Sequence, residues 1–362
     1  MKRFLLCLLL MSCPPAAVTT NTPAPEAKPP SEQQELEALL LSIPPACSSI
    51  EPLETIACPE KQPEPTGACV VERYDTRSKR LTDRLVYSGT QLISEEQIVS
   101  AHTRAITTFS WDDKNRLAEK STCFTAGVGE PEWFPTWRPP MAVYDQPYNQ
   151  QNRTRVTYDG DSARPRFAQI DSTAGEASYR MKLCYAYDEN GKRARRIQTY
   201  RDQKPASLQV ESRKYSWTAQ QLASIDFRSV ALKERSLAGK SQYSVTFKYD
   251  ANGRLTDQLV SMNKQPPSKV HVTYDETGRF VAFGGIAIDW DERGRLSGLH
   301  PDDADLDGHF EWDASGRIKS ATFKNGGGFT VTYGPKCAAG FSPPPVTPSV
   351  DGYLFYEGKD EL

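Results

Sequence analysis

The sequence predicts an all-β protein in which successive antiparallel β-hairpins form an open curved sheet, with a short helix and disordered proline-rich tails. Only 38% of the 362 residues are hydrophobic, below the roughly 45–50% of average globular domains. That fraction is typical of strands that bury one face and expose the other to solvent. Apolar residues alternate in segments such as 245–249, which is the period of a strand. A short turn-like unit also recurs along the chain.

The N-terminus predicts export. The apolar run Phe4–Met11 follows two basic residues and is too short to span a bilayer, so residues 1–12 read as a signal peptide. The run ends at Leu10-Met11-Ser12-Cys13, which resembles the lipobox of bacterial lipoproteins. The resemblance implies that Cys13 is lipidated and that its acyl chains anchor the protein to a membrane. Cleavage of an ordinary signal peptide near Ala16 is the alternative.

The C-terminus is compatible with a second subcellular location. The chain ends in Lys359-Asp360-Glu361-Leu362, identical to the endoplasmic-reticulum retrieval signal. With the signal peptide and the sequon Asn152-Arg153-Thr154, it could describe a protein of the reticulum lumen. The lipobox and the tether favour the bacterial outer membrane or cell surface instead.

Proline-rich segments flank the predicted β domain. Residues 13–30 form a tether of the polyproline type. Within residues 31–67, Ser31 begins a capping-box pattern, so we expect a helix over about 32–41 that Pro44 and Pro45 stop. A cysteine- and proline-rich stretch follows. The β domain then covers 68–337, and 338–362 is a second proline-rich tail.

The recurring unit has an aromatic residue, an aspartate, a glycine, a basic residue and an aliphatic residue in this order. Close copies lie at 247–255, 272–280, 288–296 and 310–318, with looser ones at 74–75, 111–117 and 187–192. The aspartate can accept amide hydrogen bonds in a turn. Glycine suits a positive φ, a conformation that Asn115 also tolerates. The arginine can pair with the aspartate or lie over an aromatic ring.

This unit resembles the tyrosine–aspartate (YD) repeats of the Rhs family, over roughly residues 70–335. In long Rhs-type proteins such hairpins spiral into a hollow shell that encloses a toxin. The chain has too few copies for such a shell and lacks a toxin segment, so the resemblance implies an open sheet whose edges need cover. A component of a polymorphic toxin system is a further functional alternative.

Six cysteines remain when Cys7 is removed and Cys13 is lipidated. They are Cys47, Cys58, Cys69, Cys123, Cys184 and Cys337. An even number in an exported protein predicts disulfides, but six cysteines allow fifteen pairings and the sequence does not choose among them.

One acidic segment is a candidate calcium site. Asp303, Asp305 and Asp307 alternate before Gly308, and Glu311 follows; carboxylates at this spacing match the first half of a calcium loop. The closing glutamate is missing, because Ala314 holds its position. A solvated loop is the alternative. No other cofactor is expected.

A second candidate site is an aromatic insertion. Trp133, Phe134 and Trp137 stand among prolines and could bind a protein or glycan partner. The alternative is that they plug the open end of the sheet.

Charge and motifs exclude several functions. A net charge of −2 argues against nucleic acid. The four histidines accompany no nucleophile motif. The sequence therefore predicts a non-enzymatic lipoprotein of the cell envelope that displays a β scaffold to a protein or glycan. A calcium-dependent hydrolase of envelope polymers is the alternative.

Overall fold

The computed structural model describes residues 34, 37–38, 41, 43–48, 50–54, 57–100, 103–126, 150–174, 177–203, 206–233, 236–262, 266–302, 307–338 and 341. Contacts divide the chain into two units, Met1–Ser42 and Ile43–Leu362. The described residues of the first unit are all helical and lie within the helix expected over 32–41.

In the described residues of the second unit there are one short helix, α2 (Pro45–Ser48), and twenty strands. The strands are β1 (Cys69–Asp75), β2 (Leu81–Ser88), β3 (Gln91–Ser100), β4 (Thr103–Trp111), β5 (Leu117–Ala126), β6 (Gln151–Tyr158), β7 (Pro165–Ala174), β8 (Ala177–Tyr187), β9 (Arg193–Gln203), β10 (Ala206–Thr218), β11 (Gln221–Lys233), β12 (Ser236–Tyr249), β13 (Leu255–Met262), β14 (Ser268–Tyr274), β15 (Phe280–Phe283), β16 (Ile286–Trp290), β17 (Leu296–Pro301), β18 (Gly308–Trp312), β19 (Ile318–Phe323) and β20 (Gly328–Tyr333).

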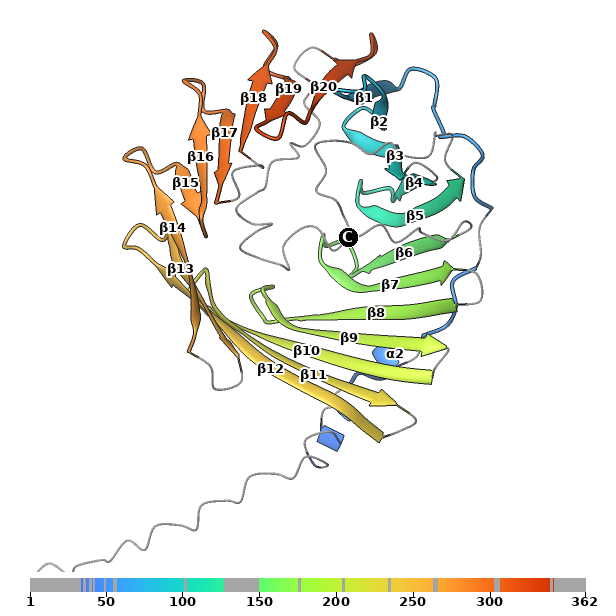
Figure 1. Ribbon diagram of the computed structural model, residues 1–362. Coiled ribbons are helices and arrows are strands. Elements are labelled where there is room, and N and C mark those ends of the chain that lie inside the picture. The colour runs from blue at the N-terminus through green and yellow to red at the C-terminus, as the bar shows by residue number, and fades with distance from the viewer. Residues whose placement is uncertain are drawn as a thin grey trace, which may run out of the picture. The chain divides into compact units, whose positions relative to one another are not determined.

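These strands form a closed antiparallel barrel, so the expected open sheet was wrong. Every strand from β1 to β19 pairs with its successor. The ring closes because β1 also pairs with β20, from Val71 opposite Tyr333 to Asp75 opposite Phe329 (Figure 1). We call this β1–β20 pair the seam. Closure removes both sheet edges, so no edge needs cover.

The resemblance to the Rhs family is corrected by the same finding. That resemblance implied a spiral shell or, for this short chain, an open sheet. The strands instead return to their starting point after one turn of twenty strands. The all-β part of the expectation holds, and the family assignment of residues 68–337 does not.

The turns nevertheless have the local chemistry expected from the sequence. In the turn after β12, the carboxylate of Asp250 accepts the amides of Asn252 at 2.9 Å and Arg254 at 2.8 Å. Its second oxygen accepts Arg254 Nε at 2.7 Å, and Gly253 has a φ of 80°. Asn115 holds the glycine's place in an equivalent turn, with a φ of 60°.

Aromatic residues before the turn aspartates link neighbouring turns. Tyr249 donates its hydroxyl to the carbonyl of Leu222 at 2.8 Å, and Trp312 Nε1 donates to Leu296 at 2.7 Å. The same bond is made by Trp111, Tyr158, Tyr187 and Trp290. Trp217 and Tyr333 also make it, although threonine and glycine follow them in place of the aspartate. Arg254 pairs with its own aspartate and lies over the ring of the next turn, Tyr274, at 5.0 Å. Each turn is therefore fastened to its neighbours.

Apolar side chains gather in three clusters along the strands. One is centred on Ile225, Val245 and Phe247, with Tyr249 and Tyr274 packed against it. The others lie around Val71 and Leu85 in one case and Val156, Ala168, Leu183 and Tyr185 in the other. Burial of these clusters is the main stabilising contribution to the barrel.

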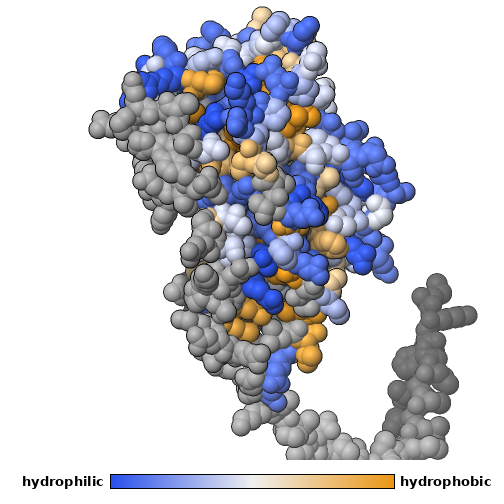
Figure 2. Space-filling view, turned by 90° about the vertical axis from the view of Figure 1, so that its right-hand side faces the viewer, coloured by the Kyte–Doolittle hydropathy of each residue, from blue (hydrophilic) through white to orange (hydrophobic). Residues whose placement is uncertain are grey.

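Few apolar side chains reach solvent. Within the described residues, the exposed large hydrophobic side chains are Leu41 and Met262. Figure 2 shows one face of the molecule, on which hydrophilic residues dominate and apolar ones form small separate patches. Among those same residues, no helix has the length and apolar character needed to cross a membrane.

Acid is expected to weaken the barrel through its turns. The pKa of Asp250 is lowered from 3.8 chiefly by the amide of Arg254, and that of Asp291 chiefly by the side chain of Arg295. A lowered folded-state pKa means that the stabilisation is present above the unfolded-state pKa and is lost as the pH falls through the folded-state pKa. We therefore expect the urea concentration at the midpoint of unfolding to decrease when the pH is lowered below about 4. Asp250→Asn should make the urea midpoint depend less on pH. An unchanged pH dependence would contradict a stabilising role of this carboxylate.

Candidate functional site

A segment that precedes β1 crosses several strands of the barrel and is joined to two of them by disulfides. We call residues 43–68 the strap. Cys47 bonds to Cys184 in β8, Cys58 bonds to Cys123 in β5, and Cys69, which begins β1 just after the strap, bonds to Cys337 after β20. These three bonds use all six cysteines whose pairing the sequence left open. The strap is therefore joined covalently to strands far from it in the chain.

Strand side chains hold the strap by its backbone. Thr199 in β9 donates to the carbonyl of Cys47 at 3.1 Å. Further along, Gln169 in β7, Arg153 in β6, Arg104 in β4 and Ser94 in β3 donate to the carbonyls of Glu51, Glu54, Glu60 and Pro63. The strap thus crosses the strands in the reverse of chain order, and it runs along the right-hand side of Figure 1 from α2 to the start of β1.

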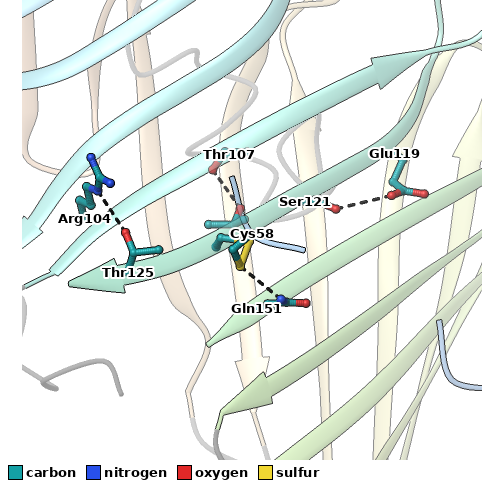
Figure 3. Close-up of a disulfide and its surroundings, with 9 residues drawn as sticks. Cys58, Arg104, Thr107, Glu119, Ser121, Thr125 and Gln151 are labelled. Atoms are coloured by element: carbon teal, nitrogen blue, oxygen red, sulfur yellow. Dashed lines mark hydrogen bonds between the residues drawn. A yellow bond between two sulfur atoms is a disulfide. The ribbon is translucent and has the colours of Figure 1, made fainter. Parts of the chain in front are cut away.

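The strap buries the side chains beneath it. Cys123, bonded to Cys58, and its strand partner Ile106 are 1% and 0% exposed, and Ile197, the strand partner of Cys184, is also buried. Figure 3 shows Cys58 over β5, with Gln151 reaching its sulfur from β6. The strap is therefore packed against the barrel as well as bonded to it.

A cleft opens between the strap and strands β6, β7 and β8. The strap contributes Pro52, Leu53 and Glu54, and the strands contribute Gln151, Arg153, Asp171, Ser172, Thr173, Ser178, Tyr179 and Arg180. The amide of Leu53 donates to Asp171 Oδ2 at 2.8 Å, which fixes the strap wall of the cleft against β7.

Charges in and beside the cleft are paired. Arg153 binds Glu119 with two hydrogen bonds, Nε to Oε1 at 2.6 Å and Nη2 to Oε2 at 3.0 Å. Burial acts to raise the pKa of Glu119, but the hydrogen bonds and charges of Arg153 and Arg155 outweigh it and lower that pKa. Arg180 lies 3.6 Å from Asp171. The cleft is therefore polar without a large net charge.

The predicted calcium segment is only partly described. Asp303 and Asp305 lie outside the described residues. Asp307 Oδ1 contacts His300 at 2.7 Å and its other oxygen contacts Lys324 at 2.6 Å. Glu311 accepts from Ser320 at 3.0 Å and lies 3.3 Å from Lys319. In the part of the chain that the structure describes, no group of three acidic, histidine or cysteine side chains is placed to hold a metal ion.

His300 bridges two acidic side chains in this region. Its Nε2 lies 2.9 Å from Asp289 Oδ2, opposite the contact with Asp307. The hydrogen bond to Asp289 is the largest influence, and with that to Asp307 it outweighs partial burial and raises the pKa of His300. The arrangement ties β16 to β17 and to the residues before β18.

The remaining predicted site residues lie outside the described residues: Cys13, Trp133, Phe134 and Trp137. The cleft, in contrast, was missed by sequence reasoning. Apart from Glu54 of the strap, its charged residues come from three strands and meet only through the register that places Asp171 opposite Arg153 and Arg180. No local motif signals such a meeting.

Comparisons with known proteins assign no family. No protein-family profile matches the chain, and no curated protein matches it. Among solved structures, a crystal structure of a porin-like protein from Bacteroides uniformis is similar over 75% of this chain and 99% of that one. The identity is 12% and the TM-score is 0.31, so this likeness carries no argument about function.

Proposed function

We propose that the protein is a non-enzymatic lipoprotein of the cell envelope, located at the outer membrane or cell surface, whose barrel displays a binding surface to a protein or glycan. The observation that carries the proposal is the set of three disulfides that fix the strap and the seam. Such bonds persist in oxidising compartments and are rare in the cytosol. They support the export that the signal-peptide pattern predicts.

Attachment through lipid fits the surface of the barrel. Membrane-spanning barrels carry an outward apolar band about 25 Å tall. Among the strand side chains that the structure describes, the large apolar one that is highly exposed is Met262, which supports attachment through lipid over insertion of the strands. An acyl chain on Cys13, joined by the tether of residues 13–30, would anchor the barrel without inserting its strands.

A scaffold role fits the use that the structure makes of its acidic groups. A glycosidase needs two carboxyl groups that face one another across a cleft. The turn aspartates, such as Asp250 and Asp313, instead bind the amide and guanidinium of the arginine four residues on. The carboxylates of these aspartates therefore stabilise the turns.

Lipidation is tested by changing the acceptor. Cys13→Ala is expected to move the protein from the membrane fraction to the soluble fraction, because the acyl chains that supply its membrane affinity are lost. Mass spectrometry of the wild-type N-terminus should show an acylated Cys13, with Cys7→Ala as the matched control. An unmodified wild-type product that begins beyond Cys13 would end the anchor proposal.

Partner binding is tested at the aromatic insertion. Capture of an envelope protein or glycan by the wild type is expected to fall by about tenfold or more in Trp133→Ala with Trp137→Ala, since buried tryptophans dominate many interfaces. Trp312→Phe, which changes a turn tryptophan, is the control. Equal capture by both variants would reject the insertion as the surface.

A further inference from the structure

We propose that the cleft between the strap and strands β6–β8 is a binding site for a neutral saccharide. This inference rests on the proposed function and names a glycan as the ligand. Small-molecule sites are concave and combine a few convergent polar groups with an apolar surface. The cleft has that composition, and its ligand class follows from charge, hydrogen-bonding groups and rigidity.

Charge balance favours a neutral ligand. The lining holds two cationic side chains, Arg153 and Arg180, and two anionic ones, Glu54 and Asp171. Arg153 is also held by Glu119 from the neighbouring strand. An anionic ligand would have to compete with these carboxylates for the guanidinium groups, and a cationic ligand would have to compete with the arginines for the carboxylates. An uncharged ligand competes neither with the carboxylates nor with the arginines.

The hydrogen-bonding groups match sugar hydroxyls. Arginine only donates, and a carboxylate only accepts. Between them the lining places the hydroxyl-bearing residues Thr173 and Ser178, which can do either. A sugar hydroxyl also donates one hydrogen bond and accepts others. A mixed lining of this kind can satisfy several neighbouring hydroxyls at once.

Two strap residues supply an apolar surface beside these groups. Pro52 and Leu53 line the cleft together with the charged strand side chains. An apolar wall beside convergent polar groups is typical of small-molecule sites.

The strap wall is held in place before any ligand arrives. Pro52, Leu53 and Glu54 lie between Cys47 and Cys58, each of which is bonded to a strand. Leu53 donates its amide to Asp171, and the carbonyl of Glu54 accepts from Arg153. Binding therefore need not order the wall, which removes one of the main entropic costs of association.

The test is calorimetry on full-length protein carrying Cys13→Ala, with maltohexaose and N-acetylglucosamine hexamer as neutral probes and trigalacturonate as the anionic probe. We expect one neutral probe to bind and the anionic probe to bind more weakly or not at all. Arg180→Gln should weaken binding by about tenfold, the size of one hydrogen bond to a charged group. Arg228→Gln, the same change at an exposed site on β11, should not.

A further variant separates the site from a general loss of folding. Replacing Cys58 and Cys123 together by serine leaves the lining unchanged but frees one end of its strap wall, so the affinity should fall while circular dichroism stays that of a β protein. Failure of every neutral probe to bind, tighter binding of trigalacturonate, or equal binding by Arg180→Gln and Arg228→Gln would overturn the proposal. If the partner captured through Trp133 and Trp137 still binds in that case, the proposed function stands without this site.

Discussion

Replacing Cys69 and Cys337 together by serine is expected to lower the free energy of unfolding by about 4 kcal/mol, the upper part of the range for a disulfide. The bond joins residues 268 apart at the seam. Every other neighbouring strand pair is also linked by the chain that runs from one strand to the next. The seam has no such chain link: beside its ladder of hydrogen bonds, the bonds from Arg77 to the carbonyls of residues 325 and 326 and the apolar cluster around Val71, it is joined covalently by this disulfide, so its loss should weaken the barrel there.

The Cys47–Cys184 bond supplies the control. It joins residues 137 apart, and the entropic cost of a closed loop grows so slowly with length that the two bonds should differ by only about 0.6 kcal/mol on that ground. Urea unfolding should show a difference between the two double variants that is larger than this. In the variant without the Cys69–Cys337 bond, amide exchange should speed up most in β1 and β20. Equal losses of stability with uniform exchange would mean that the seam has no special weakness.

The turns could be predicted from the sequence because their chemistry is local. Asp250, Gly253 and Arg254 lie within five consecutive residues, and the turn needs nothing beyond them. The pattern also gave the correct alternatives for the arginine, which pairs with its aspartate and covers an aromatic ring. It did not show that this ring belongs to the next turn, since that contact depends on how strands lie side by side.

Closure could not be predicted, because it is the sum of small twists over many strands. No residue of β1 or β20 differs in kind from residues of other strands, yet Val71 and Tyr333 face each other at the seam. The resemblance to the Rhs family misled for the same reason: a repeated turn specifies neighbours and leaves the curvature of the sheet open. The pairing of Cys69 with Cys337 would have indicated closure, had the sequence been able to select it among fifteen possibilities.

The candidate site was harder still. Arg153, Asp171 and Arg180 are unremarkable charges on three alternating strands, which a sequence reading assigns to a solvated face. The strap makes them a site by lying across them, and its path is set by Cys47 and Cys58. Knowledge of those two bonds and of the strand register was needed to place Glu54 beside Arg153.

Gly328→Ala is expected to destabilise the barrel by about 3 kcal/mol or more, the cost of a steric clash that a packed interior cannot relieve. Gly328 begins β20 with a φ of 154°. A Cβ there would lie 2.2 Å from the carbonyl oxygen of Ala321 and 3.1 Å from the Cα of Thr322. Both are backbone atoms of β19, so relief requires β19 and β20 to move apart next to the seam.

Gly294→Ala isolates the part of that cost which comes from backbone conformation alone. Gly294 has a φ of 72°, and a Cβ there would meet nothing within 4 Å. Its substitution should cost about 1–2 kcal/mol, the penalty of a left-handed conformation. The two melting curves, measured side by side, should therefore separate clearly, with Gly328→Ala the lower. Since the clash is with the backbone of β19, coincident curves would show that β20 can move away from β19 there, and the close contact between the two strands at Gly328 would have to be abandoned.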